Sequence, residues 1–250
     1  MENEDERSGN FGFLTGNMLK IAACAFMLVD HTGTILFPDV IALRIIGRLA
    51  MPLFAFMFAE GCRYTRNKLR HFLLLFCLAI ATGIVMSVAQ GAVCGDILTT
   101  FSFSCLIIYA LDALKKYAAL KDRRNIALSA LALTAALALA IGVCCFSGMY
   151  VDYGIAGVML PVTVRLLDFG SFGFTGPAAD IYSRTVALMC FAAGLVAVSL
   201  AIGGIQTFCL LALIPLAFYN GKRGKLRMKY FFYIFYPAHL IILYGINLLL

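Results

Sequence analysis

Charged residues are scarce in this chain. Only 13% of its 250 residues are Asp, Glu, Lys or Arg, whereas 62% are hydrophobic, and the mean hydropathy is +0.93. A soluble domain carries about 25% charged residues and could not bury so much apolar surface. The composition therefore excludes an ordinary soluble fold. The apolar residues lie in runs of about twenty, the length that a helix needs to cross the hydrocarbon core of a bilayer.

The short segments of alternating polarity that would predict a transmembrane β-barrel are missing as well. Because lipid offers the backbone no hydrogen bonds, we expect the long apolar runs to be α-helices. The predicted fold class is all-α, a polytopic membrane bundle of about nine helices, in which the short sixth and eighth spans could be tilted, broken or partly re-entrant. The predicted spans are 18–37, 41–60, 71–89, 97–112, 126–147, 151–167, 185–203, 205–218 and 230–249.

Internal repeats, low-complexity linkers and metal-binding cysteine spacings are also absent. We therefore expect a single transmembrane domain at 17–250, preceded by an acidic cytoplasmic tail at 1–16, and no metal site. The nine cysteines are expected to act as small apolar packing residues. Cys94 and the pair Cys144–Cys145 fall near one face of the predicted bundle, where a disulfide could form.

The basic residues have an asymmetric placement. The net charge of +7 does not predict a nucleic-acid partner, because the Lys and Arg residues lie in short loops between apolar runs. Alternate loops hold all but two of the 20 basic residues. The positive-inside rule places these loops in the cytoplasm, which puts the N-terminus inside and, for an odd number of spans, the C-terminus outside. We expect a multi-pass protein of the inner (plasma) membrane.

The two remaining basic residues, Arg44 and Arg48, fall inside the second predicted span. They share a helix face at spacing i, i+4, and a charge at membrane depth usually faces a bundle interior or a water-filled cavity. Asp30 and His31 of the first span lie at the same depth, because a short turn joins the two spans as antiparallel neighbours. We interpret these four residues as a catalytic site with His31 as general base. The alternative is a buried ion pair that only fixes the helix pairing.

Neighbouring residues on a helix point about 100° apart, so Asp30 need not bond His31 and could instead hold an arginine. Tyr236 and His239 share a face of the last span at i, i+3. We expect them to line the channel of a bound substrate, although His239 could equally be a structural histidine. It is also the second candidate for the catalytic base.

The cytoplasmic loop after the second span holds Arg63 and Arg66, which could bind the phosphates of a nucleotide-like donor. The positive-inside rule alone also explains these charges. Glu60, at the end of the same span, could contact the donor or could be an ordinary interfacial charge. His71 lies at a basic boundary and is expected to be solvated. Asp96 opens a span, where an acidic residue suits a helix N-terminus.

Several motifs carry a family resemblance. They read Asp-His-Thr-Gly at 30–33, Arg-Ile-Ile-Gly-Arg-Leu-Ala-Met-Pro-Leu-Phe at 44–54, Asp-Tyr-Gly-Ile-Ala-Gly at 152–157 and Phe-Tyr-Pro-Ala-His-Leu at 235–240. Together they resemble the TraX family over most of the chain, most specifically over 17–67. The resemblance implies a membrane-bound acetyltransferase, named for acetylation of the N-terminus of a conjugative pilin. It also implies kinship with membrane acyltransferases that use acetyl-CoA.

These observations predict an integral-membrane acetyltransferase that uses cytoplasmic acetyl-CoA as donor substrate. The acceptor would be an amine or hydroxyl of an envelope substrate, either a protein N-terminus such as a pilin or a glycan. Arg44 or Arg48 would stabilise charge on the thioester oxygen, or hold an anionic group of the substrate. The alternative is a proton-coupled transporter in which Asp30, His31 and His239 form a proton relay. A third interpretation is a structural or assembly protein of the membrane.

Overall fold

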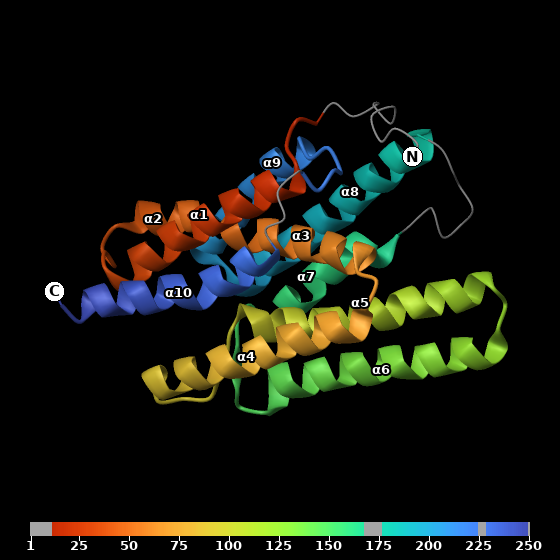
Figure 1. Cartoon of the computed structure of the whole chain (residues 1–250), viewed down its shortest axis with the longest axis horizontal. Helices are drawn as coiled ribbons and strands as arrows, with labels where there is room; N and C mark the ends of the chain where they lie inside the picture. Colours follow the sequence, from red (N-terminus) through yellow and green to blue (C-terminus); the bar gives the residue numbers. More distant parts are fainter. Residues whose placement is uncertain (1–11, 168–176, 225–228, 250) are drawn as a thin grey trace. The chain divides into compact units, whose positions relative to one another are not determined.

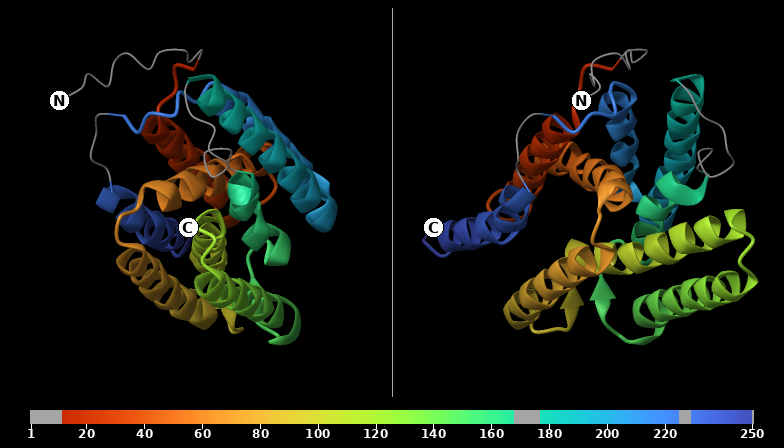
Figure 2. Two further views of the ribbon diagram at one scale, coloured as in Figure 1. Left: turned by 90° about the vertical axis from the view of Figure 1, so that its right-hand side faces the viewer. Right: turned by 45° about the vertical axis from the view of Figure 1, so that its right-hand side comes forward.

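The structure, a computed structural model, describes residues 12–167, 177–224 and 229–249. Most of the predicted acidic tail at 1–16 lies outside the described residues. The helices are α1 (Gly16–Ile35), α2 (Ile41–Gly47), α3 (Ala50–Tyr64), α4 (Lys68–Gln90), α5 (Ile97–Ala119), α6 (Arg123–Phe146), α7 (Gly154–Leu166), α8 (Pro177–Ile202), the 3-10 helix η3 (Gly204–Ala212), α9 (Leu213–Ala217) and α10 (Lys229–Asn247) (Figure 1). The two-residue strands β1 (Cys94–Gly95) and β2 (Tyr150–Val151) pair in parallel and are drawn as arrows in Figure 2.

The predicted all-α membrane fold is confirmed. Within the described residues, six helical segments are long and apolar enough to cross a membrane, judged by length and composition. They are Gly16–Ile35, Ile41–Tyr64, Lys68–Val88, Ile97–Ala119, Arg123–Phe146 and Tyr182–Ile202. Gly154–Leu166, Gly204–Ala217 and Ile234–Asn247 are shorter apolar helices, so the predicted count of about nine spans is not confirmed. The chain is a multi-pass α-helical membrane protein.

The second predicted span is not one continuous helix. A turn at Arg48 and Leu49 separates α2 from α3. Pro52 explains the break, because a proline lacks the N–H that would bond the carbonyl four residues earlier, here that of Arg48, and its ring clashes with that carbonyl. Proline is tolerated in the first turn of a helix, where Pro52 lies in α3. The break occurs at one of the predicted catalytic residues.

The chain packs as two compact units, each described by itself. Of the described residues, the first comprises those up to residue 57 and those from residue 199 onwards, and the second comprises those between 58 and 198. In the first unit, α1 packs beside α2 and α10, and α2 also contacts η3. In the second unit, α5 packs along α6 and also contacts α4 and α7. All four predicted catalytic residues, with Tyr236 and His239, belong to the first unit.

Two glycines permit the close approach of α1 and α2. A Cβ atom added to Gly47 would overlap the side chain and the Cα atom of Asp30. A Cβ atom added to Gly33 would lie 2.8 Å from the Cβ atom of Leu43. Gly47 therefore sets the distance between α1 and α2 at the level of Asp30.

We expect Gly47→Ala to lower the free energy of unfolding by about 1–3 kcal/mol, the usual effect of overpacking. Backbone atoms of Asp30 stand in the way and cannot move independently of α1. Gly61→Ala is the matched control, because no heavy atom lies within 4 Å of its added Cβ. Thermal unfolding of both variants in detergent measures the difference. Equal stability of the two would show that α1 and α2 are not tightly packed at Gly47.

Candidate functional site

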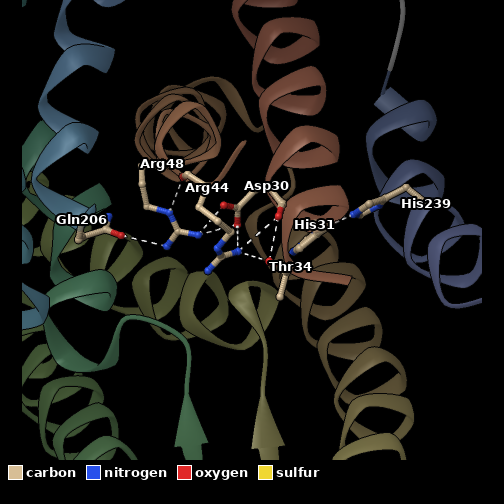
Figure 3. A network of polar contacts seen from close by, with 7 residues as sticks. All are labelled: Asp30, His31, Thr34, Arg44, Arg48, Gln206 and His239. Carbon is tan, nitrogen blue, oxygen red and sulfur yellow. Dashed lines mark hydrogen bonds and ion pairs between the residues drawn. The ribbon is translucent and has the colours of Figure 1, made fainter. Parts of the chain in front are cut away.

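Polar side chains of the first unit gather on both sides of α1, as Figure 3 shows. They are Asp30, His31, Thr34, Arg44, Arg48, Gln206 and His239. Asp30 points towards α2, and His31 points towards α10. This division follows from the turn of about 100° between neighbouring residues of a helix. Asp30 and His31 therefore have different partners, as the sequence allowed, and this group of side chains contains an ion-pair cluster and a histidine pair.

The ion-pair cluster joins Asp30 to both arginines of the second predicted span. One terminal nitrogen of Arg48, Nη2, lies 2.6 Å and 2.7 Å from the two carboxylate oxygens of Asp30. Nη1 of Arg44 lies 3.0 Å from Oδ2 of the same carboxylate. The Asp30 and Arg48 side chains are only 14% and 11% exposed. Two guanidinium groups surround one carboxylate, which leaves the cluster with one more positive than negative charge.

The two arginines are held differently. Arg48 also donates to Oε1 of Gln206 at 3.2 Å and, through Nε, to the carbonyl of Arg44 at 3.3 Å. Gln206 lies in η3 and is 1% exposed. Arg44 donates to the hydroxyl of Thr34 and is 27% exposed. Arg44 is therefore the arginine better placed to meet a ligand, and Arg48 is fixed within the protein.

The histidine pair joins α1 to α10. Nδ1 of His31 lies 2.7 Å from Nε2 of His239, and the two rings stack with centroids 4.9 Å apart. Nδ1 of His239 lies 2.8 Å from the carbonyl oxygen of Phe235. His239 is buried, and its ring contacts that of Tyr236 edge-on, with centroids 5.8 Å apart. Tyr236 and His239 thus share a helix face, as predicted, and His239 contacts the predicted base directly.

The hydrogen bonds of this pair assign the proton positions. A carbonyl oxygen only accepts, so in the neutral ring the proton of His239 is on Nδ1, and its Nε2 is an acceptor. Nδ1 of His31 must then donate to His239. The lone pair of His31 is consequently on Nε2, which makes no hydrogen bond among the described residues. The chain of bonds from Phe235 through His239 to His31 therefore leaves Nε2 as the unprotonated nitrogen of His31.

The predicted donor-binding residues of the α3–α4 region lie in the second unit. Glu60 is half-buried in α3, and the side chains of Arg63 and Arg66 are exposed. The guanidinium of Arg63 lies 5.6 Å from the centroid of the Tyr64 ring. None of these contacts identifies a ligand, so their assignment to donor binding stays a prediction.

Sequence reasoning missed an ion pair in the second unit. Asp112 of α5 and Arg165 of α7 lie 3.0 Å apart and are both largely buried. Lys115 donates to the carbonyl of Arg165, and together with Lys116 and Ala119 these residues line a pocket. The sequence offered one indication of this pair, because Asp112 and Arg165 both fall near the predicted cytoplasmic ends of their spans.

Three other predictions concern the second unit. His71 was expected in solvent but is half-buried, with Nδ1 2.6 Å from the hydroxyl of Tyr109. Asp96 caps α5, as its position suggested, by accepting hydrogen bonds from the N–H groups of Leu98 and Thr99 at 3.1 Å. The cysteines considered for a disulfide are all free: Cys94, Cys144 and Cys145.

The sequence is similar to one family model and to other bacterial proteins. Residues 15–247 match the family model described as TraX protein. An uncharacterised protein of Rickettsia prowazekii (strain Madrid E) is 32% identical over 101 residues, which are 40% of this chain and 40% of that protein. The probable fimbrial assembly protein FimC (serogroup H1) of Dichelobacter nodosus is 26% identical over 246 residues, covering 90% of this chain and 92% of that protein. No solved structure matches the chain.

Proposed function

The chain belongs to the TraX family, and we propose that it is an integral-membrane acetyltransferase. It would move the acetyl group of acetyl-CoA to an amine or hydroxyl of an envelope substrate. The observation that carries the proposal is the hydrogen-bond chain from the Phe235 carbonyl through His239 to His31. This chain leaves Nε2 of His31 with a lone pair, on the same turn of α1 as a cluster with excess positive charge.

The reaction needs a base and a group that stabilises an oxyanion. Nε2 of His31 would take the proton of the acceptor amine or hydroxyl as that group attacks the thioester carbonyl. A new C–N or C–O bond then forms and the C–S bond breaks. The proton on His31 passes to the sulfur of the departing coenzyme, which leaves as free thiol. His239 would stabilise the transient imidazolium by accepting the hydrogen bond from Nδ1.

Arg44 is the group proposed to stabilise the developing oxyanion or to hold an anionic part of the substrate. Its guanidinium is the more exposed of the two in the ion-pair cluster. Asp30 acts as a positioning residue, because its carboxylate fixes both guanidinium groups. Arg48 fastens this cluster to η3 through Gln206.

A pilin-like protein N-terminus is the acceptor that the comparisons favour. The name of the Dichelobacter nodosus relative refers to fimbrial assembly, which supports a protein subunit of a surface fibre over a glycan. Mass spectrometry of envelope peptides and glycans, with and without the gene, tests this directly. Loss of an acetyl group from a pilin N-terminus is expected without the gene. An unchanged acetylation pattern of both peptides and glycans would contradict the proposal.

For the coenzyme phosphates, two basic surfaces of the second unit are candidates. Arg63 and Arg66 are exposed on the α3–α4 region. Lys115, Lys116 and Arg165 line the pocket that also contains Asp112. The pocket gathers three cations around one carboxylate, and an anion bound there would contact several donors at once. We therefore propose the pocket as the stronger phosphate site.

Charge-reversing substitutions show which of the two basic surfaces binds the coenzyme phosphates. Lys115→Glu combined with Lys116→Glu is expected to weaken acetyl-CoA binding at least tenfold, because each lost charge-assisted hydrogen bond contributes about 1.5–3 kcal/mol. Arg63→Glu combined with Arg66→Glu serves as the matched double variant and is expected to change affinity less. Isothermal titration of the purified proteins with acetyl-CoA gives both values. The reverse order of effects would assign the phosphates to Arg63 and Arg66.

One observation favours a second candidate function, a proton-coupled transporter. Two histidines in direct contact on α1 and α10 could pass a proton between them. Asp30 is poorly suited to join such a relay, because its carboxylate is held in ion pairs with Arg44 and Arg48. Proton flux in proteoliposomes without coenzyme turnover would favour the transporter.

A further inference from the structure

Three potential metal ligands converge in the second unit, outside the residues assigned to acetyl transfer. Cys62 lies near the end of α3, His71 in the first turn of α4, and Cys105 in α5. Their two sulfur atoms and a ring nitrogen all lie within 4.8 Å of one another. Sγ of Cys105 is 4.0 Å from Nδ1 of His71. Cys62 and Cys105 are fully buried.

The hydroxyl of Tyr109 is a fourth polar group close to these three ligands. Tyr109 is one helical turn beyond Cys105, and its hydroxyl lies 2.6 Å from Nδ1 of His71. Two thiols, an imidazole and a phenol therefore surround one point between α3, α4 and α5. Simple apolar packing of cysteines does not require such convergence.

The chemical type of the ligand atoms and the distances between them indicate which metal ion fits. Cysteine thiolates and imidazole favour zinc, copper(I) and related metals over Mg²⁺ or Ca²⁺. Two thiolates neutralise a divalent ion completely, whereas a monovalent ion would leave a negative charge in a buried site. In a tetrahedral zinc site with Zn–S bonds of about 2.3 Å, two sulfur ligands are about 3.8 Å apart. The three ligand atoms, all within 4.8 Å of one another, are already close to this spacing.

We propose that Cys62, His71 and Cys105 form a Zn²⁺ site. The two thiols lose their protons on binding, and the metal takes the point between the sulfurs and Nδ1. Tyr109 borders the open fourth position, which a water or the phenol oxygen can fill. The ion would fasten the α3–α4 turn to α5 within the second unit. The site is independent of the proposed transferase function.

Metal analysis of the purified full-length protein tests the site. After growth with added Zn²⁺ and removal of loosely bound metal by a weak chelator, we expect about one zinc per chain. Cys62→Ser and Cys105→Ser should each lose this zinc. Cys77→Ser is the matched control, because Cys77 is an exposed cysteine of α4, and it should keep the metal. Zinc content unchanged in both ligand variants would overturn the proposal.

Cobalt substitution tests the same claim without relying on a variant that folds. Co²⁺ added to the metal-free wild-type protein should give sulfur-to-cobalt charge-transfer absorption and the intense visible bands of a tetrahedral centre. His71→Ala should change the visible bands but keep the sulfur-to-cobalt absorption. The absence of sulfur-to-cobalt absorption in folded wild-type protein would overturn the proposal. Recovery of Cys62 and Cys105 as a disulfide under reducing purification would overturn it as well.

Discussion

His31→Ala is expected to lower the rate of acetyl transfer by about 10² to 10⁴, the usual contribution of a general acid–base group. Nε2 of His31 is the ring nitrogen that the bonds through His239 leave free to take a proton. Insertion and coenzyme binding should stay near normal, because the substitution removes no charge and leaves the ion-pair cluster in place. Release of free coenzyme thiol in the presence of an acceptor measures the rate.

The control for His31→Ala is Leu28→Ala on the same helix. Leu28 is one of the exposed apolar residues, so its truncation should change neither stability nor rate appreciably. His239→Ala should give an intermediate loss of rate, since Nδ1 of His31 would lose its partner but Nε2 would stay in place. A folded His31→Ala protein with full activity would end the assignment and make His239 the leading candidate for the base. A purely structural histidine would instead lose stability, and activity only in proportion.

Asp30→Ala is expected to lower the free energy of unfolding by about 3–5 kcal/mol, the cost of removing one partner from a buried ion pair. The largely buried guanidinium of Arg48 would lose both carboxylate contacts, and that of Arg44 would lose its ion pair. Unfolding in mixed detergent micelles, followed by circular dichroism, measures the change.

A double-mutant cycle separates the lost ion pair from the lost packing. The pair Asp30→Ala with Arg48→Met should be less destabilised than the sum of the single variants, because no charge of that pair is then left without its partner. Arg48→Lys keeps the charge but offers a single nitrogen, which cannot bond Asp30, Gln206 and the carbonyl of Arg44 together as the three guanidinium nitrogens do. It should show an intermediate loss. Additive effects throughout would mean that Asp30 and Arg48 do not stabilise each other.

The depth of the charged residues in the membrane could be predicted from the sequence. The predicted ends of the spans and the rise per residue of a helix determine which residues of adjacent helices lie at the same depth. On this ground we predicted Asp30 at the level of Arg44 and Arg48, and both arginines form ion pairs with it in the structure. The break before α3 was also accessible, since Pro52 removes the bond to Arg48. The predicted span at 41–60 falls within Ile41–Tyr64, which is long and apolar enough to cross a membrane, but the prediction did not include the break.

Contacts between helices distant in the sequence were not accessible. Nothing in the order of residues shows that α10 packs on α1, so the sequence could name His31 and His239 as candidates but not as partners. The same limit hid Gln206, whose side chain reaches Arg48 from η3. Cys62, His71 and Cys105 come from three helices without a metal-binding spacing, and only tertiary packing gathers them.

Acetyl transfer by the purified protein decides between a transferase and a transporter. The protein would be reconstituted in liposomes with acetyl-CoA, carrying an isotope label in the acetyl group, and a synthetic peptide with a pilin-like N-terminus. We expect labelled acetyl-peptide and free coenzyme thiol in equal amounts, with both products reduced together in the His31→Ala protein. Failure of well-folded wild-type protein to acetylate peptide or glycan acceptors, with proton flux across the same liposomes, would contradict the proposed function.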